Sequence, residues 1–189
     1  MNELQSYIRS YFGVDVDDLA KLEELFRVQD LTKGAFHTKI GNRHSDLSFV
    51  RSGYLRVYTT FRDKEVTQWI ASPGEFITDL SCLMFEQPAR WNIEALTDCE
   101  LFTIYRSDYH SIHHRIPDWD RLEKLFLSKC FVSIEERVFS FLSLSAEERY
   151  QHLFETKRAL FNQIPLQYLA SMLGMTPETF SRIRRKSIS

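Results

Sequence analysis

Short runs of alternating apolar and polar residues occupy the middle of the chain. Between Ala35 and Ile104 these runs are rich in β-branched and aromatic residues, and turn residues separate them: LSFVRSG, YLRVYTTF, EVTQWI, WNIEAL and ELFTI. Glycines fall between the runs, where turns need them, at Gly34, Gly41, Gly53 and Gly74. Short strands with turn signals between them predict an all-β sandwich or barrel.

Helical patterns flank this β region on both sides. The first 30 residues read as helical, with Leu4, Ile8 and Tyr11 on one face and a break at Gly13. After the β region, the stretch 118–143 contains no Gly or Pro, and Pro117 suits the first turn of a helix there. The pattern therefore predicts a helical start, a β domain and one long helix, in that order.

The long helix carries an apolar stripe that must be buried. Its members recur at helical spacing and are Trp119, Leu122, Phe126 and Cys130. The β domain can cover part of such a stripe, and the same helix of a second copy can cover the rest. We therefore assign these four residues to a dimerisation helix over residues 117–134.

The densest motif of the chain, IPLQYLASMLGMTPETFSRIRRK, begins at Ile164. A helix-turn-helix needs a small residue where its helices touch and a glycine in the tight turn, and Ala170 and Gly174 are spaced for these two roles. Thr176 then suits the N-cap and Pro177 the first position of the second helix. The apolar positions of the unit are also filled, by Leu169, Leu173, Met175, Phe180 and Ile183.

The second helix of this unit, residues 177–187, is basic. The chain as a whole holds 24 Lys and Arg against 26 Asp and Glu, a net charge of −2, which excludes a globally basic nucleic-acid coat. The last twelve residues, in contrast, hold one acid, Glu178, and four bases. Ser181, Arg182 and Arg185 point away from the apolar face, where they suit DNA bases and phosphates. A helical hairpin that only closes a core is the alternative.

Three segments together make the chain resemble the Crp/Fnr superfamily of bacterial transcription regulators. They are VRSGYLRVY from Val50, PGEF at 73–76 and ETFSRIRRK at 178–186. The resemblance covers nearly the whole chain and implies an α+β fold. Its expected parts are a cyclic-nucleotide-binding-type β barrel (a double-stranded jelly roll) with flanking helices, a long dimerisation helix and a C-terminal helix-turn-helix domain. The sequence ends at Ser189, so we expect no full winged hairpin after it.

The resemblance also implies roles within the recognition helix. Glu178 and Arg182 match two positions that read base edges in family members. Pro177 replaces an arginine that is common at its position, so we expect a different operator sequence. The DNA-binding set is completed by Thr176, Ser181 and Arg185, as backbone or flanking contacts, and by Lys186.

An effector pocket follows from the same resemblance. In cyclic-AMP-binding relatives, the glutamate of a Gly-Glu pair holds the ribose, while backbone amides and the arginine of an Arg-Ser pair about ten residues later hold the cyclic phosphate. The matching residues here are Thr78, Asp79, Leu80, Ala89, Arg90 and Trp91. Asp79 can still accept from a hydroxyl, but Ala89 stands at the arginine position and Arg90 comes one residue late.

Burying a phosphate without a paired cation is costly. We therefore expect that the barrel does not bind cyclic AMP in the usual manner. The residues leave open whether another small effector binds or none.

Other classes of function find little support. The three cysteines, Cys82, Cys99 and Cys130, lack the spacing of a zinc or iron–sulfur site, and we expect reduced thiols and no metal. The sequence contains no GxSxG, P-loop or GxGxxG motif, so we expect no enzyme. We see no secretion signal and no apolar run of about 18 residues, and we expect a cytoplasmic protein without a membrane span.

The combined interpretation is a homodimeric regulator that binds double-stranded DNA. Residues 1–116 form the sensor, residues 117–134 the dimerisation and connecting helix, and residues 135–189 the DNA-binding domain. RNA polymerase is a further partner that the resemblance implies. Two alternatives stay open: a ligand-sensing or protein-interaction module without DNA binding, and a small β-barrel metal enzyme.

Overall fold

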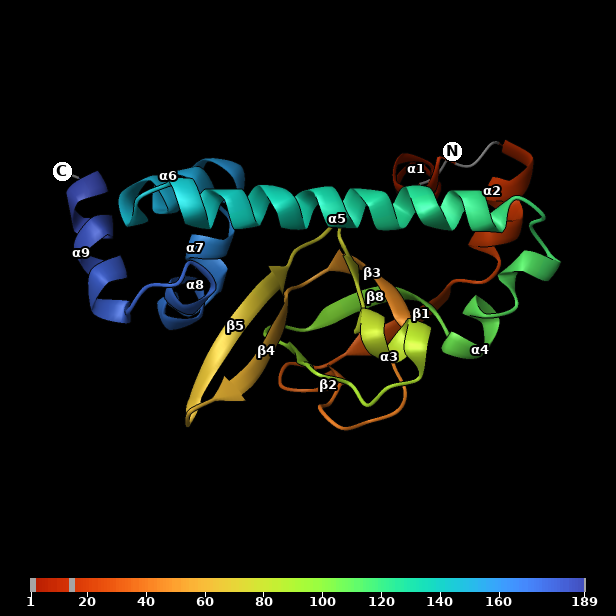
Figure 1. Cartoon of the computed structure of the whole chain (residues 1–189), viewed down its shortest axis with the longest axis horizontal. Coiled ribbons are helices and arrows are strands. Elements are labelled where there is room, and N and C mark those ends of the chain that lie inside the picture. The colour runs from red at the N-terminus through yellow and green to blue at the C-terminus, as the bar shows by residue number, and fades with distance from the viewer. Residues whose placement is uncertain (1–2, 14–15, 189) are drawn as a thin grey trace.

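One helix of 25 residues, α5 (Trp119–Ser143), runs along the whole molecule in the computed structural model (Figure 1). The structure describes residues 3–13 and 16–188. A β domain lies below the middle of α5, the N-terminal helices lie at one end, and the C-terminal helices gather at the other. The helices besides α5 are α1 (Glu3–Phe12), α2 (Val16–Glu23), α3 (Leu80–Phe85), α4 (Arg106–Tyr109), the 3-10 turn η1 (Ile112–His114), α6 (Ala146–Thr156), α7 (Leu160–Gln163), α8 (Leu166–Met172) and α9 (Pro177–Ile188).

The β domain is a sandwich of two four-stranded antiparallel sheets, as the alternating pattern predicts. One sheet has the order β1-β8-β3-β6 and the other the order β2-β7-β4-β5. The strands are β1 (Arg27–Leu31), β2 (Phe36–Thr38), β3 (Leu47–Ser52), β4 (Leu55–Phe61), β5 (Lys64–Ala71), β6 (Phe76–Ile77), β7 (Asn92–Ala95) and β8 (Cys99–Ile104). Between the sheets lies an apolar core that includes Val50, Leu55, Ile93 and Leu101.

The first strand begins earlier than the sequence pattern indicates. The first 30 residues read as helical, but β1 starts at Arg27 and pairs along its whole length with β8. Only Leu31 of this edge strand is buried. Because such a strand has almost no alternation of buried and exposed positions, its own sequence does not reveal it, and pairing with β8 decides its conformation.

Gly53, in the turn between β3 and β4, is a position where only glycine fits. Its φ is +85°, and an added Cβ would lie 2.4 Å from the backbone oxygen of Asp98. The backbone of β8 therefore approaches too closely for any side chain. This turn belongs to the VRSGYLRVY segment, so a steric requirement explains one of the glycines on which the resemblance rests.

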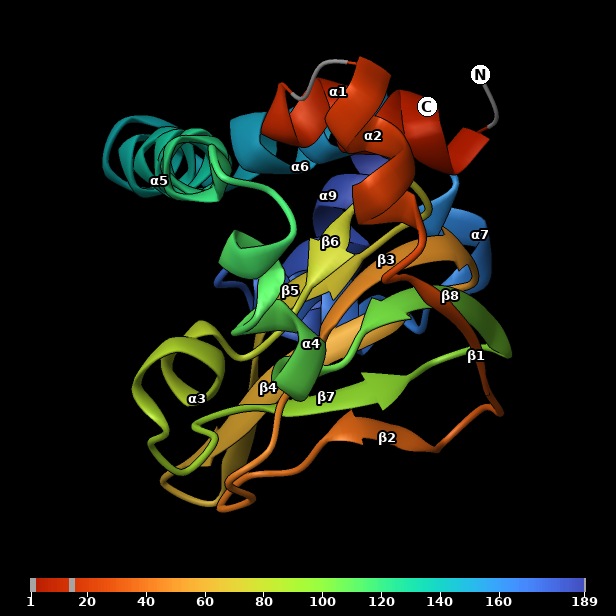
Figure 2. The same ribbon diagram turned by 90° about the vertical axis from the view of Figure 1, so that its right-hand side faces the viewer.

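The first half of α5 is buried against its own protomer, and this corrects the assignment of the dimer residues. Trp119, Leu122 and Phe126 are almost fully buried in a core formed with α1 and α2. The rings of Phe12 and Phe126 stack with their centroids 4.7 Å apart. Figure 2 looks along α5 and shows α1 and α2 beside it above the sandwich. These three side chains therefore fill an intramolecular core, and Cys130 at its edge is half-buried.

The second half of α5 presents a broad apolar surface to solvent. Its members, all at least 50 % exposed, are Phe131, Val132, Ile134, Val138, Phe139 and Leu142. We call this set the α5 stripe. Half of its members, Val138, Phe139 and Leu142, lie beyond residue 134, where we placed the boundary of the dimerisation helix, because the helix continues unbroken to Ser143.

The C-terminal helices form a core of their own. Ser145 accepts a hydrogen bond from the N–H of Glu148, whose side chain accepts from the N–H of Ser145, so the predicted capping box starts α6. Tyr150, Phe161 and Phe180 pack against one another at the centre of this core. Ile70 of β5 is fully buried in the same core, so the C-terminal helices pack directly on the sandwich.

Candidate DNA-binding helix and effector pocket

The α8–α9 pair has the local geometry that its sequence predicts. Ala170 is fully buried, and Gly174 adopts a left-handed conformation with a φ of +68°. An added Cβ on Gly174 would lie 2.9 Å from the ring of Phe141, so both the turn and the contact with α5 require glycine. Thr176 accepts a hydrogen bond from the N–H of Thr179 at 3.3 Å, which is the pattern of a helix N-cap.

Polar side chains of α9 lie on the outer surface of the molecule. Glu178, Arg182, Arg185 and Lys186 are exposed, Ser181 is half-buried, and Phe180 and Ile183 face the core. The Nζ atom of Lys186 lies 2.8 Å from Oε1 of Glu147 on α6. This hydrogen bond and the positive charge of Lys186 lower the pKa of the Glu147 carboxyl. The predicted DNA-binding residues therefore lie on α9 or just before it, at the opposite end of the molecule from α1 and α2 (Figure 1).

The six predicted pocket residues differ widely in exposure. Asp79 is 1 % exposed, and Ala89 is buried, whereas Leu80 and Arg90 are exposed at the surface. The carboxylate of Asp79 accepts four hydrogen bonds from its own chain and is the N-cap of α3. Asp79 is therefore not free to accept from a ligand hydroxyl as we expected.

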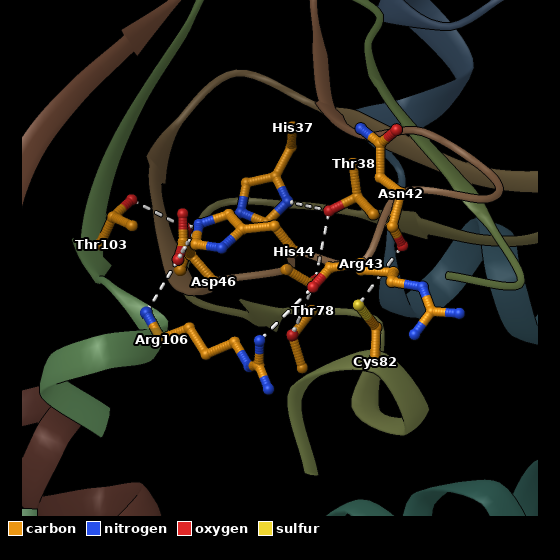
Figure 3. A network of polar contacts seen from close by, with 12 residues as sticks. His37, Thr38, Asn42, Arg43, His44, Asp46, Thr78, Cys82, Thr103 and Arg106 are labelled. Atoms are coloured by element: carbon orange, nitrogen blue, oxygen red, sulfur yellow. Dashed lines mark hydrogen bonds and ion pairs between the residues drawn. The ribbon is translucent and has the colours of Figure 1, made fainter. Parts of the chain in front are cut away.

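A chain of hydrogen-bonded polar side chains runs through one part of the sandwich, around His37 (Figure 3). His37 is its centre, with Nδ1 at 2.9 Å from Oγ1 of Thr38 and Nε2 at 2.8 Å from Oγ of Ser48. The chain continues on one side through Thr103 to Gln29, and on the other through Ser45 to Thr78. The N–H of Asp79 donates to Ser45 at 3.0 Å, which ties this network to the pocket residues.

The buried position of His37 makes the fold sensitive to acid. Burial lowers the pKa of His37 to about 4, and the charge of Asp46 opposes this effect only in part. The unfolded chain takes up this proton near pH 6.5, whereas the folded chain does not until about pH 4. The free energy of unfolding should therefore fall as the pH drops from 6.5 to 4, by about 2–3 kcal/mol from this residue.

Urea unfolding at pH 7.0, 5.5 and 4.5 measures this loss. The free energy of unfolding of His37→Gln should depend less on pH than that of the wild type, so the difference in stability between the two proteins should become smaller as the pH falls. His152→Gln is the control, because His152 is exposed on α6 and outside the sandwich, and this variant should keep the acid dependence of the wild type. An equal acid dependence in the wild type and in His37→Gln would show that His37 is not the sensitive group.

Two arginines join the sandwich to the C-terminal helices. Arg56 of β4 is 2 % exposed and lies between the rings of Tyr58 and Tyr168, at 4.1 and 3.8 Å from their centroids. Arg137 of α5 donates to the backbone oxygens of Gln68 on β5 and Met172 on α8. Burial lowers the pKa of Arg137. Each arginine therefore contacts both parts of the molecule, and Arg137 contacts three elements.

Removing Arg137 should loosen the C-terminal helices from the sandwich. Arg137→Met keeps an apolar stem but leaves two carbonyl oxygens without their donor, which should cost about 1–3 kcal/mol. Differential scanning calorimetry should show the single unfolding transition of the wild type broaden or split into two. Arg121→Met is the control on the same helix, because Arg121 is exposed and pairs only locally with Asp118. An unchanged single transition in Arg137→Met would contradict the coupling.

A hollow of about 440 Å³ lies between the β4–β5 hairpin, α5 and α8. Trp91 lines it together with Phe61, Val66 and Phe141, and it is the only one of the six predicted pocket residues that does so.

Within residues 3–13 and 16–188, no group of three or more His, Cys, Asp or Glu side chains is placed to hold a metal ion. No helix in the same part of the chain is long and apolar enough to cross a membrane.

Comparisons with known proteins agree with this architecture. Residues 28–115 match the family model of the cyclic nucleotide-binding domain. The catabolite activator protein of Thermus thermophilus has a TM-score of 0.59 and 22 % identity, and the match covers 95 % of this chain and 85 % of that one. The c-di-GMP responsive regulator CLP of Xanthomonas campestris has a TM-score of 0.68 and 18 % identity, with 91 % of each chain covered.

FixK2 of Bradyrhizobium japonicum has a TM-score of 0.66 and 20 % identity, with 85 % of this chain and 83 % of that one covered. These solved structures share the fold of this chain. A comparison with curated proteins finds no match. The β-sandwich with its helices thus has a fold like that of the catabolite activator protein, as the sequence predicts for the β domain.

Sequence reasoning missed the residues that join the two parts of this fold. Arg56 stands among apolar residues in β4, a central strand of its sheet, and that local pattern does not predict its contact with Tyr168 of α8. Arg137 reads as a solvated position of a long helix. Both become functional candidates only when the C-terminal helices pack on β5, which no local pattern reveals. The VRSGYLRVY segment did contain Arg56, but the motif alone does not show that its guanidinium is buried.

Proposed function

We propose that the protein is a homodimeric transcription regulator that binds double-stranded DNA through α9. The exposed basic face of α9 carries this proposal. Arg182 and Arg185 stand on a helix whose opposite side is anchored by Phe180 and Ile183, so they need no burial of their own. Such a helix, held by a second helix across a tight turn, fits the major groove and places its N-terminal residues on base edges. If the partner is chromosomal DNA, as in the bacterial regulators that the chain resembles, the protein acts in the bacterial cytoplasm.

The α5 stripe is the proposed dimer interface. Its six exposed apolar side chains are adjacent on one helix, and monomeric proteins rarely leave a continuous apolar surface of this kind in water. Pairing with the same stripe of a second copy buries both surfaces and creates a two-fold axis. The two α9 helices are then related by that axis, and the DNA site should be a palindrome with half-sites about one helical turn apart.

The alternative of an interaction module without DNA binding is less well supported. It accounts for the α5 stripe but gives no role to four bases on an exposed helix. The Crp/Fnr-type neighbours of the fold are regulatory proteins, so the β-barrel metal enzyme is also not favoured.

Selection of random duplexes on the purified protein tests the proposal. Duplexes retained at about physiological salt are sequenced, because non-specific binding is weak enough there for sequence preference to appear. We expect enrichment of a two-fold symmetric site. Retention without any enriched sequence would contradict sequence-specific regulation, and no retention of DNA would contradict DNA binding itself.

A further inference from the structure

The carboxylate of Asp79 is held by donors from two separate segments. On Oδ1 it accepts from Oγ of Ser81 at 2.8 Å and from the N–H of Cys82 at 3.1 Å, both in α3. On Oδ2 it accepts from the N–H of Arg90 at 2.6 Å and of Trp91 at 3.1 Å, in the loop that precedes β7. Three backbone N–H groups and one hydroxyl thus converge on a single buried anion.

The four donors thus surround an anion, and that anion is the carboxylate of Asp79 itself and not a bound ligand. Four donors satisfy most of the acceptor capacity of a carboxylate, which makes burial of its charge tolerable. Asp79 is 1 % exposed, so these donors, and not water, stabilise its charge. The N–H of Ala89 donates to the backbone oxygen of Asn42 at 2.8 Å, and the N–H of Gly41 donates to the oxygen of Ala89 at 2.9 Å, which hold the loop in place around the carboxylate.

A second change concerns the arginine that the resemblance assigns to phosphate binding. The position of the phosphate-binding arginine is Ala89, which is buried, and Arg90 is exposed. An external phosphate at this point would therefore meet the negative carboxylate of Asp79 without the arginine of the Arg-Ser pair. The missing arginine and the internal anion are separate observations, and both argue against a phosphate bound at Asp79.

We propose that Asp79 is a built-in anion that occupies the place of an effector phosphate, so that the barrel takes its ordered form without a cyclic nucleotide. The carboxylate does what a bound phosphate would do: it ties the start of α3 to the loop before β7. The consequence for regulation rests on the proposed function and is that DNA affinity does not respond to cyclic AMP or cyclic GMP. The role of Asp79 as the internal anion does not depend on the proposed DNA-binding function.

Chemical rescue of Asp79→Ala tests the occupancy directly. Asp79→Ala should lower the melting temperature by roughly 6–12 °C, because four donors lose their acceptor. Sodium formate at about 100 mM supplies a one-carbon carboxylate of the missing shape and should restore about 3 °C or more relative to sodium chloride at the same concentration. The wild type should change by less than about 1 °C with formate, inorganic phosphate, cyclic AMP or cyclic GMP.

Two further variants make the result decisive. Asp98→Ala is the control, because Asp98 accepts one backbone hydrogen bond at an exposed site of the same domain, and formate should not rescue it. Asp79→Asn keeps the N-cap oxygen but turns an amide toward the donors of the loop. It should fold even if Asp79→Ala does not, with a lower melting temperature that formate does not raise.

The proposal is overturned if cyclic AMP or cyclic GMP stabilises the wild type, or if Asp79→Asn is as stable as the wild type. It is also overturned if Asp79→Ala folds and gains nothing from formate. None of these measurements involves DNA, so their outcome is independent of whether the selection of duplexes succeeds.

Discussion

Replacing Arg182 with alanine should weaken binding to the selected duplex by about 1–3 kcal/mol, or roughly 5- to 150-fold, and should relax the preference at one position of each half-site. The side chain is exposed on α9, one turn after Glu178, where a guanidinium can reach two acceptors of one guanine. Fluorescence anisotropy with the selected duplex, and with duplexes changed at single positions, measures both effects.

Arg185→Ala is the matched control on the same helix. It removes an exposed charge of the same kind about one turn farther along the helix. We expect a similar loss for every sequence and a reduction of the salt slope by about one. If Arg182→Ala also weakened all duplexes equally, Arg182 would contact phosphate only, and the assignment of base reading to it would be wrong.

Charges placed in the α5 stripe should separate the dimer and remove DNA binding almost entirely. Phe139 is 69 % and Leu142 82 % exposed in the protomer, so Phe139→Glu with Leu142→Glu should not disturb its folding. In the dimer these carboxylates would face an apolar surface and their own symmetry mates, which is unfavourable by several kcal/mol. A single recognition helix binds one half-site, so affinity should drop by at least about 100-fold.

Sedimentation velocity and anisotropy on the same samples test this expectation. Ser133→Glu is the control, because Ser133 is exposed on α5 but lies off the stripe. It should remain dimeric and bind DNA. A double variant that stays dimeric, or one that is monomeric and still binds the full site tightly, would contradict the role of the stripe.

The fold could be predicted well where steric requirements act locally. The turns at Gly53 and Gly174 need a positive φ and leave no space for a Cβ, so the residues themselves report the geometry. The capping box at Ser145 and Glu148 is local in the same sense. These positions fix where strands and helices begin and end, which is why the order of the elements follows from the sequence.

The choice between two apolar surfaces of one helix could not be predicted in this way. The periodicity of α5 shows that Trp119, Leu122 and Phe126 must be buried, but it does not show against what. The structure buries them with Phe12 and its neighbours in the same protomer and leaves the α5 stripe exposed. The partner of an amphipathic helix is a tertiary property, and two apolar stripes on one helix look alike in sequence.

The state of the effector pocket also depends on tertiary structure. The resemblance implies that Ala89 stands at the position of the phosphate-binding arginine, and Asp79 reads there only as a shorter substitute for a ribose-binding glutamate. Its four donors come from α3 and from a loop 11 and 12 residues away, and only the closed loop brings them together. The sequence therefore suggests that Asp79 contacts a ligand, whereas the structure shows its carboxylate bound by donors of its own chain.

The most direct test of a two-fold regulator is the dependence of affinity on half-site spacing. The selected site is compared with one in which about five base pairs, half a helical turn, are inserted at its centre, so that the half-sites face opposite sides of the duplex. A dimer joined along α5 should bind the altered duplex at least about 100-fold more weakly, close to a single half-site. Equal affinity for the two duplexes would show that the recognition helices are not held together, and would contradict the account.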